Sequence, residues 1–73
     1  MEFKERLKQV RIENNLSQKQ VCSILKVSIN CYASYEQGRT EPSIQMLKQL
    51  CVLFNVSSDY LIGLEDEDGS KAM

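Results

Sequence analysis

Residues 16–38 read LSQKQVCSILKVSINCYASYEQG, and this stretch contains two capped helix starts about one short helix apart. Ser17 and Gln20 have the spacing of a capping box, in which each side chain bonds to a free backbone group at the start of a helix. Ser28 offers a second N-terminal cap, and Gly38 can end the second helix in the left-handed conformation. The stretch therefore predicts two short helices joined by a tight turn.

The core-facing residues of these two helices recur at helical spacing, and they are Val21, Cys22, Leu25, Tyr32, Tyr35 and Glu36. The stripe of the first helix breaks at Lys26, and Val27 brings both helices to one shared core. Two helices arranged in this way form a helix-turn-helix. The outward face of the second helix is left with Ile29, Asn30, Ala33, Ser34 and Gln37.

Three further helices are predicted on either side of this pair. Amphipathic spacing indicates a helix over about residues 2–13. Ser43 can cap a fourth helix that Asn55 ends. Ser57 can cap a short fifth helix that runs through Ile62.

The bulk composition is that of one small helical domain. The chain has 73 residues, of which 42% are hydrophobic and 26% charged. We expect an all-α fold, a compact five-helix bundle over residues 1–64, followed by an acidic mobile tail over residues 65–73. No apolar run approaches the roughly 20 residues that cross a bilayer, and the N-terminus lacks the apolar region of a signal peptide. A cytoplasmic location without a membrane partner is expected.

Residue types that carry catalysis or bind metals are scarce. The three cysteines, Cys22, Cys31 and Cys51, form no CxxC pair, and the chain has no histidine, so no metal site is predicted. The cysteines are interpreted as reduced small hydrophobes, with a redox-sensing role for Cys31 as the alternative. The chain also lacks a phosphate-binding glycine loop and clustered carboxylates before the tail. We therefore expect no enzyme activity, no cofactor and no small-molecule ligand.

Charge is distributed unevenly along the chain. The net charge is -1, but residues 1–48 hold eight basic and five acidic side chains, whereas residues 49–73 hold one basic and five acidic ones. The basic end can thus approach a polyanion while the acidic end faces away. Any attraction to phosphates should be modest and readily screened by salt.

Several separated segments, in this order, resemble the Cro and phage-repressor family of helix-turn-helix DNA-binding domains. They are LSQ (16–18), VC (21–22), KVS (26–28), YEQGR (35–39), PS (42–43) and VSSDYLIG (56–63). The resemblance covers residues 3–64. It implies a lambda-repressor-like fold and a sequence-specific regulator of transcription, a small bacterial or phage repressor that binds double-stranded DNA.

The resemblance also implies which residues contact DNA. Base reading in the major groove falls to Ile29, Asn30, Ala33 and Ser34. Asn30 can pair with adenine, the two apolar residues can contact thymine methyl groups, and Ser34 can reach a base or a phosphate, which favours an A·T-rich site. Phosphate contacts are expected from Ser17, Gln18, Lys19, Lys26, Gln37, Arg39 and Thr40. For Lys19 and Lys26 the alternative is an ordinary solvated lysine, and Lys26 stands where the family often has glycine.

Two structural contacts follow from the same resemblance. Arg11, on the apolar side of the first helix, is expected to pair with Glu36 beneath the recognition helix, the alternative being an exposed Arg11. A symmetric dimer contact would place two recognition helices about one DNA turn apart on a palindrome. The residues expected at this contact are Tyr60, Leu61, Ile62 and Leu64; alternatively, a monomer uses them to close its own core.

A second class of function also fits the sequence. The same fold can serve as a protein-interaction module, an adaptor or antitoxin, with incidental DNA binding. The low net charge favours this alternative, whereas the mixed polar and apolar outer face of the second motif helix favours DNA. The expected partners are therefore DNA and, at least on DNA, a second copy of the chain.

Overall fold

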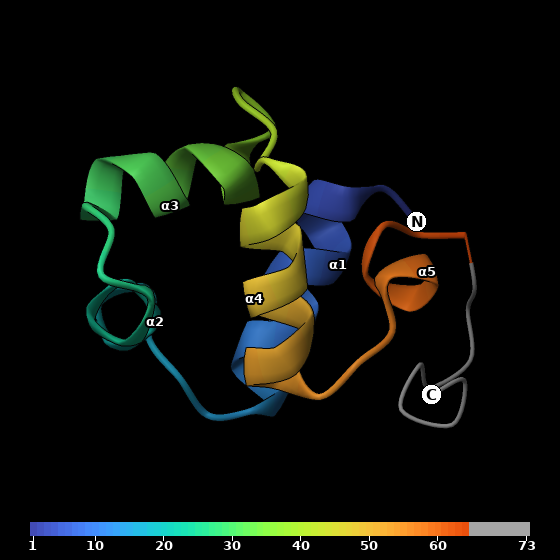
Figure 1. Ribbon diagram of the computed structural model, residues 1–73, viewed down its shortest axis with the longest axis horizontal. Helices are drawn as coiled ribbons and strands as arrows, with labels where there is room; N and C mark the ends of the chain where they lie inside the picture. The colour runs from blue at the N-terminus through green and yellow to red at the C-terminus, as the bar shows by residue number, and fades with distance from the viewer. Residues whose placement is uncertain (65–73) are drawn as a thin grey trace.

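The computed structural model describes residues 1–64, which form five helices and no strand (Figure 1). The helices are α1 (Phe3–Glu13), α2 (Gln18–Leu25), α3 (Ile29–Gln37), α4 (Ile44–Phe54) and α5 (Ser58–Leu61). The predicted all-α architecture is confirmed, with α2 and α3 as the helix-turn-helix. The predicted mobile tail, residues 65–73, lies outside the described residues.

Polar caps start the helices where the sequence places them. The Ser17 hydroxyl accepts a hydrogen bond from the Gln20 backbone N–H at 3.1 Å, and Gln20 Oε1 accepts one from the Ser17 N–H at 2.8 Å. At α3, α4 and α5 the hydroxyl groups of Ser28, Ser43 and Ser57 each accept one backbone N–H, without the reciprocal side-chain bond. These bonds satisfy backbone N–H groups that have no partner within their helix.

A residue in the left-handed conformation follows each of the five helices. These residues are Asn15, Lys26, Gly38, Asn55 and Gly63, with φ between 56° and 95°. Lys26 thus adopts the turn geometry that glycine adopts more readily, at a cost of about 1 kcal/mol. At Gly63 a Cβ atom would overlap the carbonyl oxygen of Met1, so only glycine fits there.

All five helices contribute to one core. Each supplies a side chain with no exposed surface: Leu7, Val21, Tyr32, Leu50 and Leu61. Burying a side chain of this size contributes about 1.5 to 3 kcal/mol, so the core is the main source of stability. Within the core α1 packs against α3 and α5, α2 packs against α3, and α4 contacts α5. This packing leaves the outer face of α3 uncovered (Figure 1).

The end of the described chain differs from the sequence prediction. Leu61 is fully buried and Tyr60 is 8% exposed, so both belong to the core of the chain itself. They cannot form the predicted dimer contact without opening that core. Ile62 and Leu64 remain exposed, at 38% and 75%. Helix α5 also ends at Leu61, one residue earlier than predicted, with Ile62 as its cap.

Arg6 is a buried charge that the sequence analysis does not predict. The residue is 3% exposed, and its guanidinium carbon lies 3.9 Å from the centroid of the Tyr60 ring. Its Nη1 donates a hydrogen bond to the Tyr60 carbonyl oxygen at 3.0 Å. Its Nε lies 3.2 Å from Met1 Sδ. These contacts attach α1 to α5.

Two absences hold for the described part of the chain. No helix within residues 1–64 is long and apolar enough to cross a membrane. Among the same residues, no three His, Cys, Asp or Glu side chains come together where they could hold a metal ion.

Candidate nucleic-acid interface

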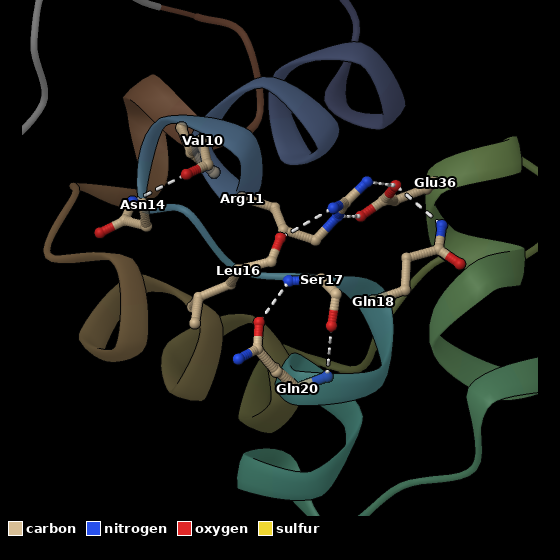
Figure 2. Close-up of polar contacts among 8 residues, drawn as sticks. All are labelled: Val10, Arg11, Asn14, Leu16, Ser17, Gln18, Gln20 and Glu36. Atoms are coloured by element: carbon tan, nitrogen blue, oxygen red, sulfur yellow. Dashed lines mark hydrogen bonds and ion pairs between the residues drawn. The ribbon is translucent and has the colours of Figure 1, made fainter.

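An ion pair between α1 and α3 fixes the position of α3 from its buried side. Arg11 Nε lies 2.7 Å from Glu36 Oε2, and Arg11 Nη2 donates to Glu36 Oε1 at 3.2 Å (Figure 2). The side chains of Arg11 and Glu36 are only 12% and 3% exposed. The pair expected from the sequence is therefore present in bidentate form. Two parallel bonds restrict the orientation of both partners, so the pair sets the angle of α3 on α1.

Two further bonds extend this pair to the start of α2. Gln18 Nε2 donates to Glu36 Oε1 at 3.0 Å, and Arg11 Nη1 donates to the Leu16 carbonyl oxygen at 2.9 Å (Figure 2). One carboxylate thus receives donors from α1 and α2 while belonging to α3. We call Arg11, Gln18 and Glu36 the carboxylate joint.

The charge state of Glu36 follows from these contacts. Burial by itself would raise the pKa of the carboxyl group, because it disfavours the charged form. The hydrogen bonds from Arg11 and Gln18, together with the neighbouring Tyr32 phenol, outweigh burial and lower the pKa. Burial raises the pKa of Tyr32. At neutral pH the carboxylate joint therefore holds one ionised carboxylate beside a neutral phenol.

The outward face of α3 presents the predicted base-reading residues. Ile29 is 49% exposed and Asn30 is exposed, whereas Ala33 and Ser34 are half-buried. All four lie on the side of α3 that no other helix covers. An exposed isoleucine beside an exposed amide offers apolar and hydrogen-bonding groups side by side, which suits the mixed apolar and polar edge of base pairs.

The loop after α3 adds to this face. A hollow of about 450 Å³ is lined by Asn30, Ala33, Ser34, Gln37, Arg39 and Thr40. Ser34 Oγ lies 2.5 Å from Thr40 Oγ1, and Arg39 Nη1 donates to Gln37 Oε1 at 3.1 Å. Sequence spacing assigns these residues to a helix and to a loop separately; it does not predict that they share one hollow.

The predicted phosphate-contacting residues border the outer face of α3. Ser17, Gln18 and Lys19 lie at the start of α2, and Lys26 lies in the turn between α2 and α3. Gln37 ends α3, and Arg39 and Thr40 follow in the loop. All are exposed except Gln18, which is half-buried because its side chain bonds to Glu36.

Comparisons with known proteins agree with this geometry. Residues 4–67 match the sequence model of the family described as a helix-turn-helix domain. The transcriptional activator BcrR of Enterococcus faecalis is 36% identical over 66 residues, which cover 90% of this chain and 32% of BcrR. The transcriptional regulator ImmR of Bacillus subtilis is 33% identical over 66 residues, which cover 90% of this chain and 52% of ImmR.

A phage repressor and a solved structure are similar as well. The CTXphi transcriptional repressor RstR of Vibrio cholerae is 28% identical over 54 residues, covering 74% of this chain and 49% of RstR. A crystal structure of a transcriptional regulator from Listeria innocua has a TM-score of 0.80 and 33% identity, covering 90% of this chain and 62% of that one. The chain spans between about a third and a half of the length of these three curated relatives.

Proposed function

This chain belongs to the helix-turn-helix domain family of transcriptional regulators, and we propose that it binds one DNA sequence by placing α3 in the major groove. The family binds DNA and is not enzymatic, so the chain is not an enzyme, as the sequence predicts. The observation that carries the proposal is the exposed face of Ile29 and Asn30 on a helix whose angle is fixed by the carboxylate joint. A reading helix needs both an accessible face and a fixed orientation.

Each residue has a stated role in the proposed complex. Asn30 pairs with the edge of adenine, and Ile29 and Ala33 contact thymine methyl groups. The start of α2 directs free backbone N–H groups at a phosphate, where the helix dipole favours negative charge. Further phosphate contacts come from Ser17, Gln18, Lys19, Lys26 and Arg39, and Gln37 lies where it can contact either a phosphate or a base edge. Such contacts set the register on the duplex but carry no sequence information.

We further propose that the chain represses transcription as a dimer on a palindromic operator. Repression by occupancy requires only DNA binding, and the relative RstR is named a repressor, although BcrR is named an activator. Ile62 and Leu64, the two apolar residues still exposed at the end of the described chain, supply the dimer contact in this proposal. Two linked half-sites bind more tightly than one because the second binding event becomes intramolecular.

A second candidate function is a protein-interaction module on the same fold. The observation that favours it is the net charge of -1, which is low for a chain that binds a polyanion. A module of this kind would bind duplexes weakly and without sequence preference.

Selection from a randomised duplex pool, followed by fluorescence anisotropy at two salt concentrations, tests the proposal. One enriched palindrome with half-sites about 10 base pairs apart is expected, with affinity falling as salt rises. Asn30→Ala should weaken binding to that palindrome about tenfold, whereas Gln49→Ala, which removes an exposed amide from α4, should leave it unchanged. Weak binding without sequence preference would favour the protein-interaction module instead.

A further inference from the structure

A relay of hydrogen bonds crosses the hollow at the end of α3. The Ser34 hydroxyl donates to the Cys31 carbonyl oxygen at 2.6 Å, and Ser34 Oγ lies 2.5 Å from Thr40 Oγ1. The loop backbone is fixed at the same place, because the N–H of Arg39 and that of Thr40 both donate to the Ser34 carbonyl oxygen, at 2.9 and 3.5 Å. The two hydroxyl groups are thus held in one arrangement.

The number of protons determines what these hydroxyl groups can offer a ligand. Each hydroxyl has one hydrogen and two lone pairs. A carbonyl oxygen only accepts, so the hydrogen of Ser34 is committed to Cys31. Thr40 must then be the donor between the two hydroxyls, and its hydrogen is committed to Ser34. Both hydrogens are thus used within the relay, and only lone pairs remain for a ligand in the hollow.

We propose that Ser34 and Thr40 together form a hydrogen-bond acceptor that reads an exocyclic amino group in the major groove, N6 of adenine or N4 of cytosine. This inference rests on the proposed DNA-binding function. In the major groove these amino groups are the hydrogen-bond donors of the base pairs, whereas guanine and thymine present acceptors there. An amino group seated against the two hydroxyls meets lone pairs that the relay has already oriented, and such relays strengthen each bond within them.

The same proton count argues against a phosphate at this position. Phosphate oxygens are acceptors and carry negative charge, so they gain nothing from these lone pairs. Thr40 is therefore assigned to base reading instead of the phosphate contact expected from its position in the loop after α3. Gln37 complements this assignment: its carbonyl oxygen is occupied by Arg39, so its free amide hydrogens can bond to a base acceptor beside the amino group.

The test uses the operator selected for the unchanged chain, synthesised with one amino group removed at a time. Adenine is replaced by purine, or cytosine by 2-pyrimidinone, at each half-site position, and binding is measured by fluorescence anisotropy. The variants are Ser34→Ala, Thr40→Val and the double variant, with Ser58→Ala on α5 as the control for loss of an exposed serine hydroxyl. Circular dichroism verifies that every variant is folded.

The inference expects one position at which the unchanged chain and Ser58→Ala lose about fivefold in affinity when the amino group is removed. The double variant should bind the two duplexes equally, and Thr40→Val should fall between. The inference is overturned if, at every position, the double variant still binds the duplex with the amino group more tightly than the one without it, by the same factor as the unchanged chain. A uniform loss of affinity that leaves this factor unchanged, as removal of a phosphate contact would produce, also overturns it. Absence of any sequence-specific binding by the unchanged chain would instead overturn the proposed function itself.

Discussion

Helix α1 carries two arginines, and each fixes it to a different neighbour by different chemistry. Arg11 meets the carboxylate of Glu36 on α3 through two hydrogen bonds. Arg6 lies against the face of Tyr60 on α5 and donates to that residue's carbonyl oxygen. We call the second contact, Arg6 with Tyr60, the aromatic joint. The carboxylate joint fixes an orientation, because a bidentate pair accepts only one relative angle, whereas the aromatic joint fixes a distance.

The glycine near each joint also has a different kind of neighbour: a flexible side chain near the carboxylate joint, and main chain near the aromatic joint. A Cβ atom added at Gly38, after α3, would meet the flexible Lys4 side chain, with Lys4 Cδ 2.7 Å away. A Cβ atom added at Gly63, after α5, would meet the backbone of Met1. The α3 side can therefore adjust to a change, whereas the α5 side cannot. For α3, in its proposed role of reading bases, polar bonds set a defined orientation. For α5, close packing against main chain fixes its position.

Breaking the carboxylate joint should have the largest effect on stability. Glu36→Leu leaves the guanidinium of Arg11 mostly buried without its carboxylate, which should cost about 3 to 5 kcal/mol of unfolding free energy in urea titrations. Arg11→Met combined with Glu36→Leu should recover most of that loss, because the buried charge is then gone. A double variant no more stable than Glu36→Leu would show that the uncompensated charge is not the cause.

The double variant also separates orientation from stability. It should fold but lose much of the operator affinity of the unchanged chain, because neither the ion pair nor the Gln18 contact then holds the angle of α3. Full operator affinity in a folded double variant would contradict the orienting role of the carboxylate joint.

The two glycines offer the next test of the comparison. Gly63→Ala should cost about 3 kcal/mol, because φ of +95° is unfavourable for alanine and the new methyl group overlaps main chain that cannot move aside. Gly38→Ala should cost about 1 kcal/mol, since Lys4 can swing away and only the backbone strain remains. Thermal unfolding of the two variants side by side measures the difference, and equal losses would refute the contrast between flexible and rigid neighbours.

The aromatic joint should show a smaller effect that depends on the ring. Tyr60→Leu should cost about 2 kcal/mol, because it removes the aromatic face that receives Arg6. Tyr60→Phe keeps the ring and should cost much less. Both are measured by urea unfolding, and a phenylalanine variant as unstable as the leucine one would assign the effect to the hydroxyl instead.

Low pH should lower the unfolding free energy through the carboxylate joint and not through the aromatic joint, and this is the smallest of the predicted effects. The pKa of Glu36 is lowered in the folded chain, so its contribution is complete above the unfolded value of about 4.3 and is lost as pH falls through the folded value. Unfolding free energy should therefore fall more steeply below pH 5 in the unchanged chain than in Glu36→Gln, which cannot titrate. Tyr60→Leu should keep the steep profile; a flattened one would show that the joints are coupled.

The five helices and the ion pair of the carboxylate joint could be predicted from the sequence. The helices are indicated by local residue patterns, and the ion pair is implied by the family resemblance. The serine caps and the helix end at Gly38 depend on neighbouring residues alone, and the non-glycine turn at Lys26 is expected from the family resemblance. Arg11 and Glu36 each lie on an apolar stripe, and an inward arginine needs a carboxylate. Their pairing across 25 positions of sequence is confirmed.

The aromatic joint could not be predicted, because its partners carry no complementary pattern. Arg6 lies three positions after Phe3 on the buried face, but its contacts with α5 are made to a ring and a main-chain carbonyl 54 positions away. For a related reason the sequence could not decide between the dimer contact and the alternative that the structure shows for Tyr60 and Leu61, burial in the core of the chain itself. In the sequence, the apolar residues of this segment exceed what one short helix needs for its own packing, and only the structure shows the space in the core that they fill. The assignment of base-reading and phosphate-contacting residues stays a prediction.

The left-handed residue after each helix limits which substitutions the chain can accept there. At these five positions the backbone is left-handed. Glycine and asparagine adopt this conformation readily, and other residues adopt it only with strain. These positions require a backbone shape and not a particular side chain, so Asn15 and Asn55 can each be replaced by glycine while the fold persists. Gly63 is the exception, since a Cβ atom there would overlap the main chain of Met1, and at Lys26 a charged side chain takes the left-handed conformation despite the strain.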